Sequence, residues 1–150
     1  ARKMVDKYRE HYSAGGMFEC DFFVCMPQVL ETLQAAGCKI AVASSKPCKY
    51  IKEILKDLGA QKYFEFVSAP EIGYSDPGKP KLIADAMQAI GAEKESTVMV
   101  GDRLFDIEGA KKVGIASIGA VYGYGGEKEL KEYGANMLAF SPAQITELIL

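Results

Sequence analysis

The chain has 150 residues, of which 49% are hydrophobic and 25% charged, and this size and balance are typical of one globular domain. Its formal net charge is −2 and it has no basic run, so we expect no nucleic-acid partner. No apolar stretch approaches the roughly 18 residues of a membrane span, and the first residues lack the apolar run of a signal peptide. We therefore expect a cytoplasmic protein, a monomer or a homodimer, that does not enter a membrane.

The cysteine and histidine content restricts the possible chemistry. The four cysteines are Cys20, Cys25, Cys38 and Cys48, and no pair has the C-x-x-C spacing of a zinc or redox site. We expect them to be reduced, packed thiols, because a disulfide scaffold is unusual at this length. His11 is the only histidine, so Ser-His-Asp, Cys-His and polyhistidine metal chemistry are not expected.

Helical and strand patterns alternate along the chain. Apolar stripes that end at glycine or begin at proline predict helices over residues 2–12, 27–36, 51–58, 79–90, 106–113, 127–133 and from 142 onward. Short apolar runs predict strands over residues 39–44, 64–69, 97–100, 116–121 and 136–140. Residues 17–26 form an irregular aromatic link. This alternation predicts an α/β protein, with a parallel sheet covered by helices on both faces.

Two carboxylates follow the apolar run Val98–Val100, which reads as a buried strand. Gly101 lets the backbone turn, Asp102 follows it, and we expect Asp106 to open the next helix. Ligands bind beyond the carboxyl ends of parallel strands, so both carboxylates can point toward one site. Two hard oxygen ligands suit Mg²⁺. The alternative is that Asp106 only caps the helix and Asp102 is a turn residue.

Two other predicted strand ends carry groups that bind phosphate. Ser44 and Ser45 follow the first strand at the start of a helix, where free N–H groups attract anions, although Ser45 could simply be a cap. Lys79 opens a later helix, where the helix dipole does not favour a positive charge. Together with the two carboxylates, these hydroxyls and this amine fit the chemistry of phosphate and Mg²⁺.

Taken in order, these segments resemble motifs two, three and four of the haloacid dehalogenase-like (HAD) phosphohydrolases. Ser44 and Ser45 fall in motif two, Lys79 in motif three, and Asp102 and Asp106 in motif four. Further similarity to the branch of phosphoglycolate phosphatases and 5′-nucleotidases lies in Tyr8–Tyr12, Lys62–Phe64 and Val121–Gly125. The resemblance implies a HAD-like, Rossmannoid, three-layer fold with the remnant of a helical cap domain.

The resemblance also implies a role for each matching residue. Ser44 would donate a hydrogen bond to the transferring phosphoryl group, and Ser45 would contact the phosphate from the same loop. Lys79 would offset charge on the nucleophile and the phosphate, and Asp102 would bind Mg²⁺; these two are the catalytic candidates. Asp106 would support the metal through its waters or hold neighbouring groups.

The resemblance divides the chain into three parts. Residues 1–19 match the end of the helical cap, residues 20–26 a linker, and residues 27–150 the HAD-like core without its first strand. One local departure is Phe23–Met26, where this branch usually has a Tyr-Pro-Gly-like turn, and it leaves the linker geometry open.

The family's first motif, an Asp-x-Asp on a strand, is absent from this sequence. Its first Asp is the nucleophile and its second the general acid/base; Asp21 does not replace them, because no apolar strand precedes it. In the family the missing strand lies between the strands that end here at Ser44 and Val100. We therefore expect an upstream segment of the same protein to supply it, and we expect these 150 residues alone to be inactive.

The expected function is Mg²⁺-dependent hydrolysis of a small phosphomonoester such as phosphoglycolate or a nucleoside monophosphate. One alternative is a sugar-phosphate mutase on the same scaffold. A second is a phosphate- or metal-binding module without catalysis, which the absent motif favours and the intact later motifs disfavour.

Overall fold

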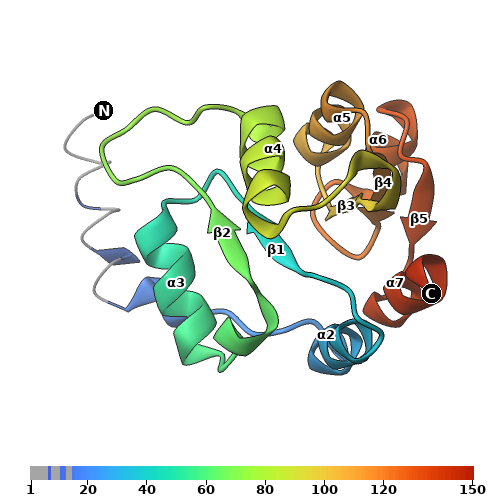
Figure 1. Cartoon of the computed structure of the whole chain (residues 1–150). Helices are drawn as coiled ribbons and strands as arrows, with labels where there is room; N and C mark the ends of the chain where they lie inside the picture. Colours follow the sequence, from blue (N-terminus) through green and yellow to red (C-terminus); the bar gives the residue numbers. More distant parts are fainter. Residues whose placement is uncertain (1–6, 8–10, 13–14) are drawn as a thin grey trace.

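The computed structural model describes residues 7, 11–12 and 15–150 (Figure 1). The elements in chain order are η1 (Gly16–Phe18), α2 (Met26–Ala35), β1 (Ala41–Ala43), α3 (Cys48–Asp57), η2 (Gln61–Tyr63), β2 (Phe66–Ser68), α4 (Lys79–Ile90), η3 (Lys94–Ser96), β3 (Val98–Gly101), α5 (Leu104–Val113), β4 (Ala116–Ala120), α6 (Gly126–Glu132), β5 (Met137–Ala139) and α7 (Pro142–Ile149). Most of the predicted helix over residues 2–12, and with it much of the predicted cap segment, lies outside the described residues.

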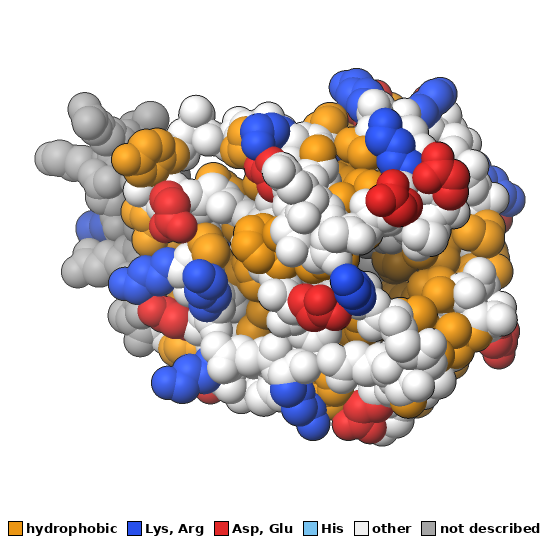
Figure 2. All heavy atoms as spheres, viewed as in Figure 1, with side chains coloured by type: hydrophobic (Ala, Val, Ile, Leu, Met, Phe, Trp, Pro, Cys, Tyr) orange, Lys and Arg blue, Asp and Glu red, His pale blue; other side chains and the backbone are white. Residues whose placement is uncertain are grey.

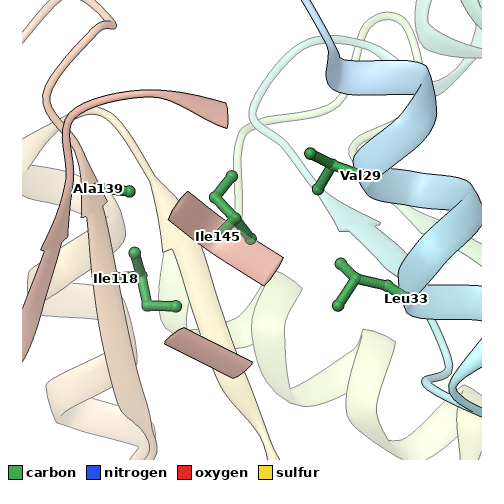
Figure 3. Close-up of a cluster of buried hydrophobic side chains, with 5 residues drawn as sticks. All are labelled: Val29, Leu33, Ile118, Ala139 and Ile145. Carbon is green, nitrogen blue, oxygen red and sulfur yellow. The ribbon is translucent and has the colours of Figure 1, made fainter. Parts of the chain in front are cut away.

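Helices cover both faces of the strands, as the sequence pattern predicts. On one face, α2 and α7 pack on β4 and β5 through a cluster of five buried side chains, which Figure 3 shows: Val29, Leu33, Ile118, Ala139 and Ile145. On the other face, α4 and α5 form a second buried cluster. Within β3, Val98 and Val100 contact the first cluster and Met99 the second, because successive side chains of a strand alternate between faces.

The parallel strands form two separate groups. β1 pairs with β2, and β3 pairs with β4, which pairs with β5; β1 and β3 do not pair with each other. In Figure 1 the β1–β2 pair lies on one side and β3–β5 on the other, and α4 packs against β1, β2 and α5 and so joins the two halves. The interruption falls where the family resemblance places the absent strand.

A cavity of about 820 Å³ lies between the two groups of strands. It is lined on one side by residues 39–43 and on the other by residues 96–100, and most of the lining side chains are apolar. On the face drawn in Figure 2, hydrophobic side chains remain exposed near the middle of the molecule. The residues of β1 and β3 are themselves only half-buried, and neither strand has a partner strand on the side that borders the cavity.

The predicted start of the helix after β3 is wrong. Helix α5 begins at Leu104, and Asp106 is its third residue, so Asp106 does not open the helix and is not its N-cap residue. The reason is a capping box: Arg103 is the N-cap residue, and the Asp106 side chain reaches back to accept the N–H of Arg103. Asp102 therefore lies before the helix, whereas Asp106 lies in its first turn.

All four cysteines are unpaired, as predicted, and Cys48 is buried. The expectation that all four are packed is wrong for Cys20 and Cys25, which are exposed. In the part of the chain that the structure describes, every helix is too short or too polar to cross a membrane.

Candidate active site

Lys79 lies between the two groups of strands, at the carboxyl end of β1. Its ammonium donates to the carbonyl oxygen of Ala43 at 3.0 Å and pairs with Asp106 Oδ1 at 2.8 Å. The side chains of the pair are only 14% and 9% exposed. Gly109 of α5 makes room for the lysine, because a Cβ there would lie 2.6 Å from Lys79 Cγ. The cation that the sequence marks as unusual at a helix start thus connects β1 to the turn after β3.

Asp106 is held on all sides. While Oδ1 pairs with Lys79, Oδ2 accepts the backbone N–H of Asp102 at 3.2 Å and of Arg103 at 3.1 Å. Gly101 is required beside it, since a Cβ at that position would lie 2.2 Å from Asp106 Cβ. With these three partners, the carboxylate holds neighbouring groups, which is one of the two roles that the resemblance implies for it.

Asp102 is clamped by the loop that follows β4. Its Oδ2 accepts the N–H of Tyr124 at 2.9 Å, and its carbonyl oxygen accepts the N–H of Gly125 at 2.9 Å. Gly123 allows this close approach, because a Cβ there would lie 2.3 Å from Asp102 Cβ. Burial, together with the charge of Asp102, raises the pKa of Tyr122 to about 12. In the described part of the chain, Asp102 Oδ1 accepts no hydrogen bond.

Glu129 of α6 is a site residue that the sequence gives no reason to select. Its Oε1 accepts the N–H of Leu104 at 2.9 Å and the Nε–H of Arg103 at 3.0 Å. The Leu104 N–H and the Arg103 guanidinium hold the pKa of this carboxyl below its usual range. Glu129 thereby fixes the turn that carries Asp102. No sequence motif relates Glu129 to the turn at Arg103 and Leu104, which lies far from it in the sequence.

The two serines after β1 make different contacts. Ser44 Oγ accepts the N–H of Lys46 at 3.2 Å, so its hydroxyl hydrogen can still be donated to a ligand. Ser45 instead donates its hydroxyl to Asp76, which also accepts the N–H of Gly78 at 2.8 Å. These two hydrogen bonds are the main reasons why the pKa of Asp76 is lowered. Asp76, which the sequence does not mark, therefore ties Ser45 to the residue before Lys79.

The donors at this edge fit Mg²⁺ in kind but do not form a complete cage. Mg²⁺ is usually bound by one or two carboxylates, with waters and phosphate oxygens completing the octahedron. Asp102 offers one carboxylate oxygen, whereas both oxygens of Asp106 already have partners. Among the described residues, no group of three or more His, Cys, Asp or Glu side chains is gathered as a metal site.

The sequence of residues 1–120 matches the family model of the haloacid dehalogenase-like hydrolases. The chain belongs to this family.

Its relatives include a 5′-nucleotidase from Pseudomonas aeruginosa, 33% identical over 89% of this chain and 60% of the relative. A phosphoglycolate phosphatase from Vibrio parahaemolyticus is 28% identical over 99% of this chain and 64% of the relative. A crystal structure of a Clostridium difficile protein assigned as a phosphatase superposes with a TM-score of 0.96 at 33% identity, covering 99% of this chain and 70% of that one. The chain thus spans less than two thirds of the length of these two curated relatives.

Proposed function

We propose that this chain is part of a cytoplasmic, Mg²⁺-dependent phosphomonoester hydrolase that acts on a small metabolite such as phosphoglycolate or a nucleoside monophosphate. The observation that carries the proposal is the Lys79 ammonium, fixed between Ala43 and Asp106 at the strand edge where Ser44 and Asp102 also lie. The family and its phosphatase members support the reaction class. The four unpaired cysteines support the location.

Each residue at this edge has a part in the proposed reaction. Ser44 donates its free hydroxyl hydrogen to a phosphoryl oxygen, and Lys79 offsets the negative charge of the phosphoryl group. Asp102, whose Oδ2 is held by the Tyr124 N–H, would hold Mg²⁺ through its Oδ1, and the ion would supply further neutralisation of phosphate charge. Asp106 positions Lys79 and the turn of Asp102.

The nucleophile, in this proposal, comes from a strand of an upstream segment that lies in the cavity between β1 and β3. On that side, β1 offers the backbone groups of Ala41 and the N–H of Ala43, whose carbonyl oxygen accepts a hydrogen bond from the Lys79 ammonium. The reason is that the Ser44 N–H and the Ile40 carbonyl both form hydrogen bonds on the β2 side. Successive residues of a strand direct their backbone groups to opposite sides, so those of the odd-numbered residues between them face the cavity. The lining segments are about five residues, or roughly 17 Å, long, which suits one short strand paired on both sides. The relatives have the additional length that such a segment needs.

With that strand in place, the reaction is an in-line displacement. A carboxylate of the strand attacks phosphorus, the ester P–O bond breaks, and the alcohol leaves with a proton from a second carboxyl group. Water then cleaves the acyl phosphate, which restores the carboxylate and releases inorganic phosphate.

Release of inorganic phosphate by the gene product that includes its upstream sequence tests this function. We expect phosphate from a panel of small phosphomonoesters and none from the 150-residue chain alone. Interconversion of sugar phosphates without net phosphate release would instead indicate a mutase. Phosphate binding without turnover of any ester would indicate a binding module, and either result would contradict the proposal.

Amide hydrogen exchange tests the position of the strand independently of activity. We expect peptides covering residues 39–43 and 96–100 to exchange more slowly in the longer protein than in the 150-residue chain. Peptides from β4, which is paired on both sides already, serve as the control. Equal exchange of the 39–43 and 96–100 peptides in both proteins would show that no strand occupies the cavity.

A further inference from the structure

A second cavity lies beside the proposed phosphate site. It has a volume of about 390 Å³ and lies between residues 45–50, which include the start of α3, and residues 70–76, in the loop from β2 to α4. Its size falls in the range of small-molecule sites. None of the roles proposed above uses its interior.

The cavity and the phosphate site share a wall. Ser45 lines the cavity and directly follows Ser44, the proposed phosphate donor. Asp76 lines it as well, and its hydrogen bonds to Ser45 and Gly78 fix this wall next to Lys79. A phosphate held by Ser44 and Lys79 would therefore have the cavity next to it, open to the group esterified to that phosphate.

The shape of the lining suits a flat ring. Pro47, Tyr50, Pro70 and Tyr74 supply flat, largely apolar surfaces. The ring of Tyr12 packs on Tyr50 edge to face, with centroids 5.3 Å apart. Tyr74 is 79% exposed, so most of its ring is available for contact with a ligand. Aromatic rings of this kind stack readily on nucleobases.

The charge of the lining is negative. Glu71 and Asp76 carry carboxylates, and none of the residues that line this described cavity is a lysine or arginine. The neighbouring Lys46 does not line the cavity: its ammonium bonds the hydroxyl of Tyr12 at 2.5 Å and lies 5.2 Å from the centre of that ring. A ligand with hydrogen-bond donors is favoured here, and a ligand with its own carboxylate is repelled.

We infer that this cavity binds the leaving group of the substrate, and that this group is a flat ring with hydrogen-bond donors, such as the nucleoside of a nucleoside 5′-monophosphate. Phosphoglycolate, whose leaving group bears a carboxylate, is a poor fit. The inference rests on the proposed function and selects between the two substrate classes that the function leaves open.

Kinetics with three esters test the inference in the gene product that includes its upstream sequence. The probes are adenosine 5′-monophosphate, phosphoglycolate and glycerol 2-phosphate. Glycerol 2-phosphate is the reference, because its leaving group has neither a ring nor a carboxylate. We expect adenosine monophosphate to have the highest kcat/KM. Tyr74→Ala should lower kcat/KM for adenosine monophosphate roughly tenfold, because the base loses one aromatic ring on which it stacks. The same variant should change kcat/KM for glycerol 2-phosphate much less.

A charge reversal provides the second variant. Glu71→Lys should raise kcat/KM for phosphoglycolate roughly tenfold, because a repelling charge becomes an attracting one near the water interface. Glu147→Lys is the matched control, since it makes the same charge change at an exposed position on α7. It should leave all three esters unchanged.

The two proposals fail in different ways. If the esters are hydrolysed but Tyr74→Ala and Glu71→Lys alter all three equally, or not at all, the cavity is not the leaving-group site and the phosphatase function stands. If no ester is hydrolysed, the phosphatase function fails, and calorimetric binding of adenosine monophosphate still tests the cavity. Binding that Tyr74→Ala does not weaken would overturn the inference.

Discussion

The ion pair between Lys79 and Asp106 is, with the Lys79–Ala43 hydrogen bond, one of the contacts that connect the two groups of strands at the proposed site, and we predict that the two charges are strongly coupled. The test is a double-mutant cycle with Lys79→Met, Asp106→Asn and the double variant. Each single change leaves a buried partner without its counter-charge. The double change removes both charges, so it should cost much less than the sum of the two single changes.

The magnitude follows from the burial of the pair. The two side chains are 14% and 9% exposed, and breaking a buried pair by removing one partner costs about 3–5 kcal/mol. Asp106 keeps two backbone N–H donors after loss of Lys79, so we expect the lower end, about 3 kcal/mol, for Lys79→Met. The coupling energy should then be about 2 kcal/mol.

Urea unfolding followed by circular dichroism measures these free energies. The matched control is the cycle Lys81→Met with Asp85→Asn, an ion pair on the same helix whose side chains are 61% and 37% exposed. For this exposed pair, four residues apart along the helix, we expect a coupling of only about 0.3–0.5 kcal/mol. If the Lys79–Asp106 coupling were as small as that of the control pair, the buried bridge would not have the role we assign to it.

Three further predictions concern other parts of the fold. Gly123→Ala should lower the apparent affinity for Mg²⁺ roughly 10- to 100-fold, because its Cβ would lie 2.3 Å from Asp102 Cβ and displace a loop that orients the proposed metal ligand. The activity of the longer protein against Mg²⁺ concentration measures this, and an unchanged midpoint would contradict it. The pKa of Glu129 in the folded protein is below its ordinary value of 4.5. Its hydrogen bonds therefore stabilise the fold fully at a pH above 4.5, and this stabilisation is lost as the pH falls through the lower pKa of the folded state. The melting temperature of Glu129→Gln should therefore fall less on acidification than that of the wild type, and parallel curves would refute this. Cys25→Gly should raise the free energy of unfolding by about 1 kcal/mol, because Cys25 adopts a φ of +67°, which costs a residue with a side chain more than it costs glycine; a loss of stability on urea unfolding would be the opposite result.

The repetitive part of the fold could be predicted from the sequence because its signals are local. Helix α4 has the predicted bounds, since Lys79-Pro80 begins it and Gly91, with a φ of +63°, ends it. Strand β1 is shorter than the predicted 39–44, because pairing with a neighbour decides the length of a strand and β1 is paired on one side only. Hydrophobicity along the chain does not report which edges are paired.

The site could be predicted in part. Ser44, Lys79, Asp102 and Asp106 do lie at the carboxyl ends of β1 and β3, and Lys79 and Asp106 are in direct contact. The start of α5 was missed because its cap is formed by a side chain inside the helix. Glu129 cannot be predicted because it acts through hydrogen bonds to a distant turn, which no local spacing encodes. Asp76 also bonds locally to Gly78, but its contact with Ser45 depends on the fold.

Phosphate release from p-nitrophenyl phosphate by the gene product that includes its upstream sequence, measured with Mg²⁺ and with a chelator, tests the phosphatase proposal most directly. We predict turnover that needs Mg²⁺ and is abolished by Asp102→Asn, while Asp85→Asn on the exposed face of α4 retains it. Full activity of Asp102→Asn, or turnover that the chelator does not affect, would contradict the proposal.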